Sequence, residues 1–398
     1  MRKFLKGAVT AAAAALLLSC GGNEDKAPQG VPTGFAVQPG DTSVVVTWDQ
    51  KPGLTYWIFS AAAPSITRDN YRDYPAARIT QPATSPQLIT GLTNGTTYSF
   101  LINATENGSA AGPSTASIAA VPRLAGGTWT LGTALPADIN AISLATGGYL
   151  AVGAGGLLYT RESKIGADWV AGTSGVSTAL NGAAALGQTI VVGDGGVILT
   201  STDAKTWTAR TSGTTVRLNG VVAGLGAFLA VGDNGTILRS TDATTWNPVT
   251  SGTTSNLYSI AVVNALLVAT GAGGTLLSSS DAGLTWTARS TGVTAGLRSA
   301  AYAGSRYVVV GDAGTVITST DVASWTAQTP PTARTLRRVV YSTQLVAVGD
   351  GGTVLLSNDG LSWTAGTSGT TADLRALVAG SQLDYLFGGT GGVNGTSR

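Results

Sequence analysis

The chain has 398 residues, of which 43% are hydrophobic and 11% are charged, and it contains 55 glycines. Few charges and many glycines argue against a long helical protein and favour many short strands joined by tight turns. The chain has no histidine and a single cysteine, Cys20, which excludes histidine-based catalytic triads, HExxH metal sites and intrachain disulfides.

The first 19 residues have the pattern of a secretory signal peptide. Three basic residues among the first six precede the apolar run AVTAAAAALLL, which is too short for a stable membrane span. The ending LLSC resembles the bacterial lipobox, and this resemblance implies cleavage before Cys20 and acylation of that cysteine. The alternative is an ordinary signal peptide with a chance cysteine. The residue after the cysteine is Gly21 and not Asp, and in this respect the sequence resembles lipoproteins that are sorted to the outer membrane.

The charge of the mature chain limits its partners. Removing residues 1–19 removes three of the 23 basic residues and leaves 20 against 21 acidic residues. The mature chain therefore lacks a strong positive field, and we expect no nucleic-acid partner. We expect a lipid anchor at Cys20, a polar tether to residue 31, and a location on either face of the outer membrane of a bacterial envelope.

Residues 32–122 have the pattern of a small β domain. The run TSVVVTW (42–48) alternates as a strand with one buried face does, and Asn94-Gly95 marks a turn. This region resembles a fibronectin type III domain, and the residues that carry the resemblance are Pro32, Trp48, Tyr56, Leu92 and Tyr98. The resemblance implies a two-sheet sandwich in which Leu92 and Tyr98 form the tyrosine corner. A spacer role is favoured over a binding role, because a fold alone implies no function.

Residues 126–398 contain an internal repeat. Its tryptophans are spaced by 38 to 40 residues, at Trp129, Trp169, Trp207, Trp246, Trp286, Trp325 and Trp363. Each period contains four short strand-like runs joined by glycine-rich turns, which is the pattern of a β-propeller blade. The count closes at seven blades if the strand around Trp129 completes the blade begun by the C-terminus. The whole chain is therefore expected to be all-β, a sandwich followed by a propeller.

The stretch SSDAGLTW (279–286) resembles the Asp-box, or BNR repeat, of sialidase-type propellers. This resemblance implies a turn between the third and fourth strands of a blade, with its Asp bonded to the turn backbone. The equivalent aspartates are Asp203, Asp242, Asp281, Asp321 and Asp359. Fivefold repetition favours a structural role, because a catalytic residue is needed once. The box tryptophans could instead be sugar-stacking platforms, but their repetition also favours the core.

A second repeated element ends in an aspartate followed by a glycine turn, at Asp194, Asp233, Asp312 and Asp350. Asp and Gly at these places are typical of hairpin turns. Calcium binding is the alternative, but one carboxylate per distant turn is too few for a site with six to eight oxygen ligands. We therefore expect no metal and no cofactor.

One register position differs between the blades. Each innermost strand begins with an apolar residue, and the residue after it is Asn140, Asn181, Asn219, Tyr258, Arg298, Arg337 or Arg375. These seven positions should form a ring at one end of the central channel. Three arginines on one side of a ring make a candidate anion site, because guanidinium groups bind carboxylates bidentately. The alternative is that each arginine pairs with a local Asp or is simply solvated.

Catalysis is not expected. A sialidase would need an FRIP-like motif and a Tyr–Glu pair, and residues 126–398 contain a single glutamate, Glu162. The repeat pattern W…L…VGD.G…S.D resembles that of the photosystem II assembly-factor propellers and their bacterial relatives, which implies a seven-bladed propeller that binds proteins and carries an arginine patch. We therefore predict non-catalytic binding of an envelope or extracellular protein, as an adhesion or assembly module. A glycan-binding or atypical glycosidase propeller is the second hypothesis, and a purely structural stalk is the third.

Overall fold

A computed structural model of the chain describes residues 30–106, 112–380 and 384–398. The expected signal peptide, the acylation site Cys20 and most of the tether lie outside the described residues. Within these ranges the regular elements are strands and short 3₁₀ turns, and none of the helical turns has the length and apolar character needed to cross a membrane.

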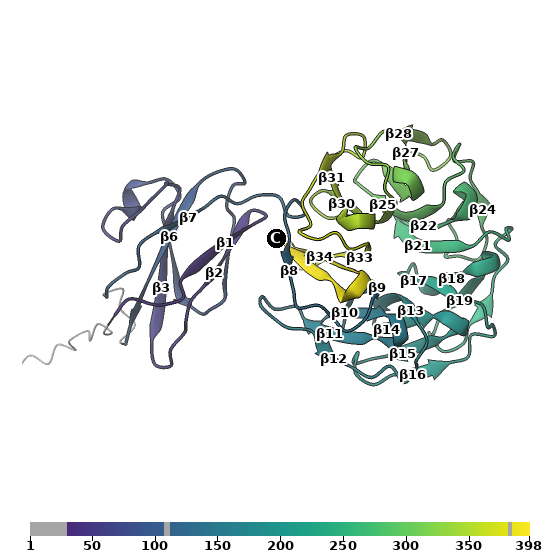
Figure 1. Cartoon of the computed structure of the whole chain (residues 1–398), viewed down its shortest axis with the longest axis horizontal. Coiled ribbons are helices and arrows are strands. Elements are labelled where there is room, and N and C mark those ends of the chain that lie inside the picture. Colours follow the sequence, from purple (N-terminus) through teal and green to yellow (C-terminus); the bar gives the residue numbers. More distant parts are fainter. Residues whose placement is uncertain (1–29, 107–111, 381–383) are drawn as a thin grey trace, which may run out of the picture.

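The N-terminal unit is a sandwich of two antiparallel sheets (Figure 1). One sheet has the order β1 (Ala36–Gly40), β2 (Ser43–Thr47), β5 (Gln87–Thr90), and the other has the order β4 (Arg78–Ala83), β3 (Thr55–Ala61), β6 (Tyr98–Thr105), β7 (Ile118–Ala120). A 3₁₀ turn, η1 (Tyr71–Asp73), follows β3. The alternating valines of β2 face the core, where Trp48 packs on Tyr56 with ring centroids 5.3 Å apart. Leu92 and Tyr98 lie in the same core, and the Thr93 N–H donates to Tyr98 Oη at 3.2 Å.

The rest of the described chain forms four-stranded antiparallel sheets, which we number 1 to 7 in chain order. Sheet 1 contains β9 (Ile139–Ala145), β10 (Gly148–Gly153), η2 (Ala154–Gly156), β11 (Leu158–Glu162) and β12 (Val170–Ala171). Sheet 2 contains β13 (Leu180–Leu186), β14 (Gln188–Gly193), η3 (Asp194–Gly196), β15 (Ile198–Ser201) and β16 (Thr208–Arg210). Sheet 3 contains β17 (Leu218–Gly224), β18 (Ala227–Gly232), η4 (Asp233–Gly235), β19 (Ile237–Ser240) and β20 (Asn247–Pro248).

The remaining sheets repeat this order. Sheet 4 contains β21 (Leu257–Val263), β22 (Leu266–Gly271), η5 (Ala272–Gly274), β23 (Leu276–Ser279) and β24 (Thr287–Ala288). Sheet 5 contains β25 (Leu297–Tyr302), β26 (Tyr307–Gly311), η6 (Asp312–Gly314), β27 (Val316–Ser319) and β28 (Thr326–Gln328). Sheet 6 contains β29 (Leu336–Tyr341), β30 (Leu345–Gly349), η7 (Asp350–Gly352), β31 (Val354–Ser357) and β32 (Thr364–Ala365). Sheet 7 contains β33 (Leu374–Ala379), β34 (Tyr385–Gly389), η8 (Thr390–Gly392), β35 (Asn394–Ser397) and β8 (Thr130–Leu131).

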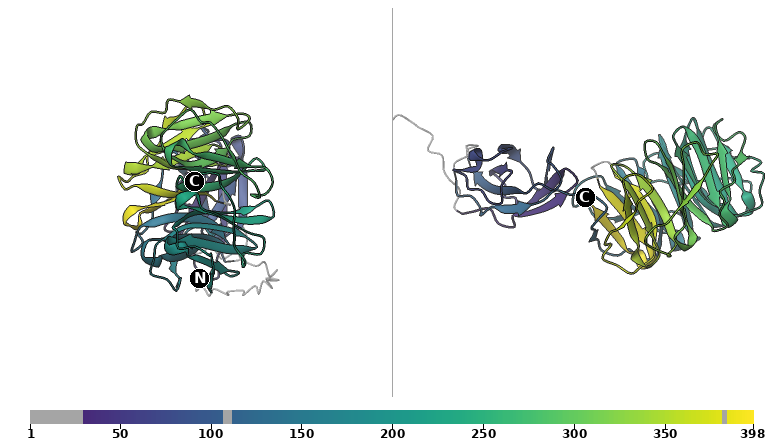
Figure 2. Two further views of the ribbon diagram at one scale, coloured as in Figure 1. Left: turned by 90° about the vertical axis from the view of Figure 1, so that its right-hand side faces the viewer. Right: turned by 90° about the horizontal axis from the view of Figure 1, so that it is seen from above.

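These sheets stand around a common axis (Figures 1 and 2). The first strand of each sheet contacts the first strand of the next, and β33 of sheet 7 contacts β9 of sheet 1, so the ring is closed. Apolar side chains fill the space between neighbouring sheets. Leu229 and Val231 of β18, for example, pack against Leu257 and Ile260 of β21. Each sheet alone would leave two apolar faces in water, so the stacking around the ring supplies the core.

Sheet 7 is made from both ends of the ring segment. Strand β8 pairs with β35, with Leu131 opposite Gly395 and Thr130 opposite Thr396. Trp129 packs on Phe387 of β34, with ring centroids 4.6 Å apart. A repeat counted from one tryptophan to the next is offset by one strand from the sheets of the structure. Residues 208–246 begin with β16, which belongs to sheet 2, because the strand after each box tryptophan is the outermost strand of the preceding sheet.

The sandwich is joined to the ring at sheets 6 and 7 (Figure 1). Buried Asp41, in the turn between β1 and β2, accepts a hydrogen bond from the Thr343 hydroxyl of sheet 6 at 2.8 Å. In the connecting segment, the Ala125 carbonyl accepts from Gln344 Nε2 at 2.6 Å. The Gly126 N–H donates to the Ser397 hydroxyl of β35 at 2.7 Å. The connection is therefore short and is bonded to the ring at residues 125 and 126.

Candidate functional site

The candidate residues share one backbone feature. In each ring sheet the pairing between the first and second strands shifts one residue after the first strand begins, which is a β-bulge. A bulge leaves one residue unpaired and turns its side chain away from the regular alternation. The bulged residues are Asn140, Asn181, Asn219, Tyr258, Arg298, Arg337 and Arg375. The backbone therefore gives every candidate in the ring the same position in its sheet.

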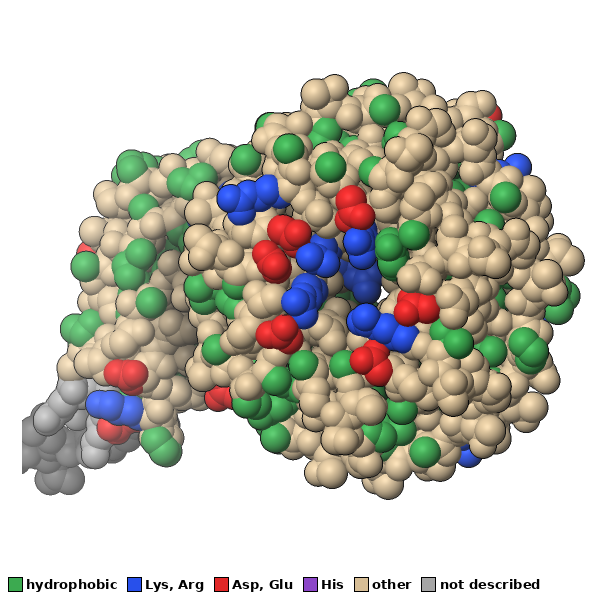
Figure 3. Space-filling view, turned by 45° about the vertical axis from the view of Figure 1, so that its right-hand side comes forward, with side chains coloured by type: hydrophobic (Ala, Val, Ile, Leu, Met, Phe, Trp, Pro, Cys, Tyr) green, Lys and Arg blue, Asp and Glu red, His purple; other side chains and the backbone are tan. Residues whose placement is uncertain are grey.

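These seven side chains lie together. They line one pocket of about 430 Å³ on the axis of the ring, together with Arg217, Asp233, Asn256 and Arg338. We call this pocket the charged mouth. Figure 3 shows its basic side chains gathered around the opening, with acidic side chains immediately outside them. Its volume falls within the usual range of pockets for small molecules or short peptide segments, roughly 300–1,000 Å³.

The three asparagines join neighbouring sheets. Asn140 Nδ2 donates to the Leu180 carbonyl at 3.0 Å, and Asn219 Nδ2 donates to the Leu257 carbonyl at 2.9 Å. Asn181 makes the equivalent bond to the Leu218 carbonyl at 3.0 Å. In each case the acceptor is the first residue of the next sheet's first strand. The amide donors of these asparagines are therefore used to hold the ring together, which leaves less of them available for a ligand.

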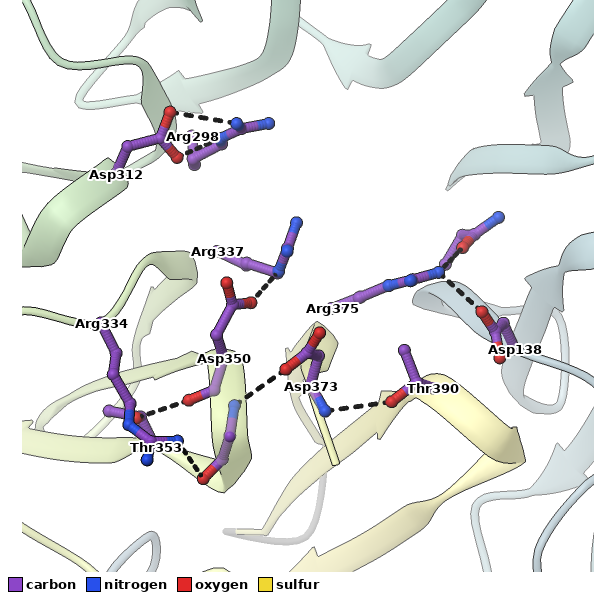
Figure 4. A network of polar contacts seen from close by, with 12 residues as sticks. Asp138, Arg298, Asp312, Arg334, Arg337, Asp350, Thr353, Asp373, Arg375 and Thr390 are labelled. Carbon is purple, nitrogen blue, oxygen red and sulfur yellow. Dashed lines mark hydrogen bonds and ion pairs between the residues drawn. The ribbon is translucent and has the colours of Figure 1, made fainter. Parts of the chain in front are cut away.

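The three arginines are ion-paired (Figure 4). Arg298 Nε lies 2.8 Å from Asp312 Oδ1, and Arg337 Nε bonds Asp350 Oδ1. In both pairs the aspartate is the first residue of the 3₁₀ turn in the same sheet, so the two repeated sequence positions meet across the hairpin. Asp194 and Asp233 of sheets 2 and 3 use the same place to accept from Asn181 and Asn219.

Arg375 follows a different route, because the turn of sheet 7 begins with Thr390 rather than an acid. Arg375 Nη1 instead lies 2.9 Å from Asp138 Oδ2, just before β9 of sheet 1. This ion pair spans the join between the last sheet and the first. Of the two alternatives for the three arginines, the structure therefore has the one in which each pairs with an aspartate.

Two further arginines line the charged mouth and are not members of the bulged ring. Arg217 Nε lies 3.0 Å from Asp194 Oδ1, so it is also paired. Arg338 comes directly after the bulge of β29, and its Nη1 donates to the Ser259 hydroxyl of β21 at 3.1 Å. Burial lowers the pKa of Arg338. The sequence signal for Arg338 is its position two residues after the strand start, where the other sheets have Ala, Gly or Ser.

Tyr258 supplies the aromatic surface of the charged mouth. The Arg298 guanidinium lies over the Tyr258 ring, 4.1 Å from its centroid. A guanidinium at this distance interacts favourably with the face of an aromatic ring. Tyr258 belongs to sheet 4 and Arg298 to sheet 5, so this contact joins two neighbouring sheets. It lies where the bulged residues change from asparagine to arginine.

The Asp-box residues lie at the other edge of the sheets, between the third and fourth strands. The Thr245 and Thr244 N–H groups and the Ser240 hydroxyl donate to Asp242 Oδ1 at 2.8 to 2.9 Å and hold the pKa of Asp242 at about 2. Two following N–H groups and the serine two residues earlier likewise lower the pKa of Asp203, Asp321 and Asp359. At Asp281 the Thr285 hydroxyl contributes most, followed by the Thr285 N–H and the Ser279 hydroxyl, and the pKa is again lowered. This is the turn that the Asp-box resemblance implies. Among the described residues no group of three or more His, Cys, Asp or Glu side chains is arranged to hold a metal ion.

Comparisons with known proteins place the fold. No protein-family profile matches the sequence, and no curated protein matches it. The structure of YCF48 bound to D1 peptide is similar over 67% of this chain and 94% of that chain, with a TM-score of 0.57 and 16% identity. YCF48 from Cyanidioschyzon merolae is similar over 67% of this chain and 98% of that chain, with a TM-score of 0.56 and 16% identity.

A streptogramin B lyase is similar to the same extent, over 68% of this chain and 97% of that chain, with a TM-score of 0.58 and 12% identity. At these identities the likeness is one of fold. Together with the closed ring of four-stranded sheets, it makes the C-terminal part of the chain a β-propeller. The all-β prediction and its propeller are confirmed.

Proposed function

We propose that the chain is a non-catalytic lipoprotein of the bacterial cell envelope, whose seven-bladed propeller binds a protein partner at the charged mouth. On this proposal residues 1–19 are removed, Cys20 is acylated and residues 20–31 form a tether. Residues 32–122 are a fibronectin type III-like spacer, and residues 126–398 are the propeller. The fibronectin type III-like assignment of residues 32–122 is supported by sheets of three and four strands and by the bond from Thr93 to Tyr98.

The observation that carries the proposal is the loss of symmetry at the charged mouth. The strand starts, the 3₁₀ turns and the Asp-boxes repeat around the ring and have repeated bonding, so they account for the fold. The bulged residues have the same backbone position but change from asparagine through tyrosine to three arginines. Binding sites are concave places where a few polar groups converge, and this pocket has that character. YCF48, which has a similar fold, is known with a D1 peptide bound.

A carbohydrate-active role is supported less well. Glycoside hydrolysis uses two carboxyl groups on opposite sides of the scissile bond. At the charged mouth Asp138, Asp312 and Asp350 each hold an arginine. The box residues Trp246 and Trp363 are buried in the core between sheets and are not exposed as stacking platforms. The similar fold of a lyase shows that propellers also support catalysis, so the proposal rests on these residues and not on the fold.

The proposal predicts that a partner depends on the ion pairs of the charged mouth. The test captures proteins from detergent-solubilised envelope of the source cell on the mature chain with Cys20→Ser. A paired variant changes Arg298, Arg337 and Arg375 to Gln and Asp312, Asp350 and Asp138 to Asn, which leaves the net charge unchanged. We expect that a protein retained by the parent chain is not retained by the paired variant. The charged groups of the mouth that would hydrogen-bond the bound partner are neutral in that variant.

A control variant changes Arg210, Arg239 and Arg289 to Gln. Arg239 lies on a third strand, Arg210 on a fourth strand and Arg289 directly after one. None of them lines the pocket, and each hydrogen-bonds a third-strand or turn atom. The control should retain the partner. Retention of the same proteins by the parent chain and the paired variant would contradict the proposal.

A further inference from the structure

The third residue of each first strand has a strict size limit, with one exception. Two residues after each strand start, the seven sheets carry Ala141, Gly182, Gly220, Ser259, Ser299, Arg338 and Ala376. We call this set the second layer, because it lies one step deeper along the axis than the bulged residues. Six of its members are small and buried, whereas Arg338 is large and partly exposed. Six sheets have a small residue at this position and sheet 6 alone has an arginine, so sheet 6 requires a local explanation.

The size limit comes from the convergence of the first strands at the axis. A Cβ on Gly182 would lie 3.1 Å from the Gly220 Cα, and a Cβ on Gly220 would lie 3.3 Å from the Ser259 Cα. The Ser299 hydroxyl accepts from the Val339 N–H of the next sheet at 3.2 Å. There is no room between neighbouring strands for a long side chain. Arg338 therefore extends into the pocket, past sheet 5, to reach Ser259 of sheet 4.

The charge of Arg338 is not compensated by a neighbouring acid. Arg217, Arg298, Arg337 and Arg375 each lie within ion-pair distance of an aspartate, whereas no carboxylate among the described residues does so for Arg338. The hydrogen bond from Arg338 to Ser259 uses one of the five N–H groups of the guanidinium. An arginine remains charged in a protein, so the partial burial of Arg338 removes part of its hydration without supplying a counterion.

We propose that Arg338 is the anion-recognition residue of the charged mouth, and that the pocket takes a carboxylate group there. This inference rests on the proposed binding role of the pocket and names the chemistry of the ligand. The guanidinium fork matches a planar carboxylate, which can accept two parallel N–H bonds. The carboxylate belongs either to the end of a partner's polypeptide chain or to a free small molecule, and both sources present the same group.

The rim of the pocket favours a carboxylate over a dianion such as phosphate. Five aspartates stand near the mouth, at Asp138, Asp194, Asp233, Asp312 and Asp350. Four of them neutralise the four paired arginines, and Asp233 accepts from Asn219. One uncompensated guanidinium below this rim balances a single negative charge, and a second negative charge would meet acidic groups on the way in.

The test measures binding of defined probes by titration calorimetry at pH 7 and constant ionic strength, on the mature chain with Cys20→Ser. The probes are acetyl-triglycine with a free terminal carboxylate, the same peptide ending in an amide, sodium acetate and inorganic phosphate. We expect the carboxylate peptide to bind and the amide peptide not to bind. Tighter binding of the peptide than of acetate would identify a chain end as the source, and equal affinity per carboxylate would identify a small molecule.

Variants assign the binding to the residue. Arg338→Ser should lower the affinity for the carboxylate probe at least about tenfold, and Arg338→Lys should lower it less, because it keeps the charge but loses the fork. Arg334→Gln is the matched control. Arg334 is exposed, lies two residues before β29 and does not line the pocket. Equal binding of acid and amide peptides, tighter binding of phosphate than acetate, no binding of any probe, or unchanged affinity of Arg338→Ser would each overturn the inference.

Thermal stability separates recognition from a structural role. Serine is the residue of sheets 4 and 5 at this position, so Arg338→Ser should fold and should melt at the same or a higher temperature than the parent. A lower melting temperature would mean that the arginine holds the ring together and would overturn the inference. The probe titrations use no partner protein, so their failure leaves the capture experiment untouched. Loss of capture by the paired variant would still support the proposed function.

Discussion

Asp242 and its four counterparts illustrate how a short polar side chain fixes a turn. Each carboxylate accepts from a serine hydroxyl and from two backbone N–H groups, which otherwise would have no partner in the loop between the third and fourth strands. These bonds favour the ionised form and therefore lower the pKa values of the five aspartates. The Asp-box, which identifies the repeat in the sequence, therefore also makes the stability of the propeller depend on pH.

Stability should fall in acid because of these turns. Their folded-state pKa values lie below the ordinary Asp value of about 3.9, so their contribution is complete above that pH and is lost as the pH falls toward about 2, the pKa of Asp242. Urea unfolding at pH 5, 4, 3 and 2 measures the effect. A variant with all five aspartates changed to Asn should lose less stability across this range than the parent. An equal loss in both proteins would show that other carboxylates control acid unfolding.

At the scale of the element, the bulge at the start of each first strand links the fold to the site. The bulge takes Tyr258, Arg298 and Arg337 out of the regular alternation of side chains along the strand and turns their side chains toward the axis. Regular strands would have put these side chains between the sheets, where six of the seven second-layer residues are small. The charged mouth therefore exists because the backbone is irregular at the same place in every sheet.

The sequence predicted the elements better than the contacts. The tryptophan period and the glycine turns indicated four-stranded units, because periodicity is local. The residue after each strand start was recognised as variable, and the structure places all seven such residues in one pocket. The ion pair from Arg375 to Asp138 was not predicted, because it joins residues at opposite ends of the ring. Arg338 is not among the seven ring positions predicted from the sequence, because the size limit at its position comes from the distance between neighbouring strands.

The closing strand provides a prediction about the ring. Trp129→Ala should lower the free energy of unfolding by about 3 kcal/mol, because it removes a large apolar side chain packed on Phe387 in the sheet that joins the two ends. Leu131→Ala, two residues further along the chain and 43% exposed, is the control and should cost much less. Deleting residues 126–133 should destabilise the whole propeller. An unchanged melting temperature after the deletion would contradict closure by β8.

At the scale of the whole molecule, a sandwich and a propeller are joined by a short, bonded segment. Asp41, the acceptor of the Thr343 hydroxyl, is buried at the junction, and it also accepts from Asn94 Nδ2 at 2.8 Å. The junction lies beside sheets 6 and 7, at the edge of the ring where the third strands end and the first strands turn back. The charged mouth is at the other edge, where the first strands begin, so the sandwich does not cover it.

The most direct test of the account replaces Tyr258 with a photoreactive amino acid in the source cell. Tyr258 lines the charged mouth, and Tyr341, at the far end of a first strand and 42% exposed, is the matched position on the opposite face. We predict that illumination cross-links a partner protein at position 258 and not at position 341, and that adding the paired variant's changes abolishes the adduct. Cross-linking at position 341 alone, or equally at both positions, would contradict binding at the charged mouth.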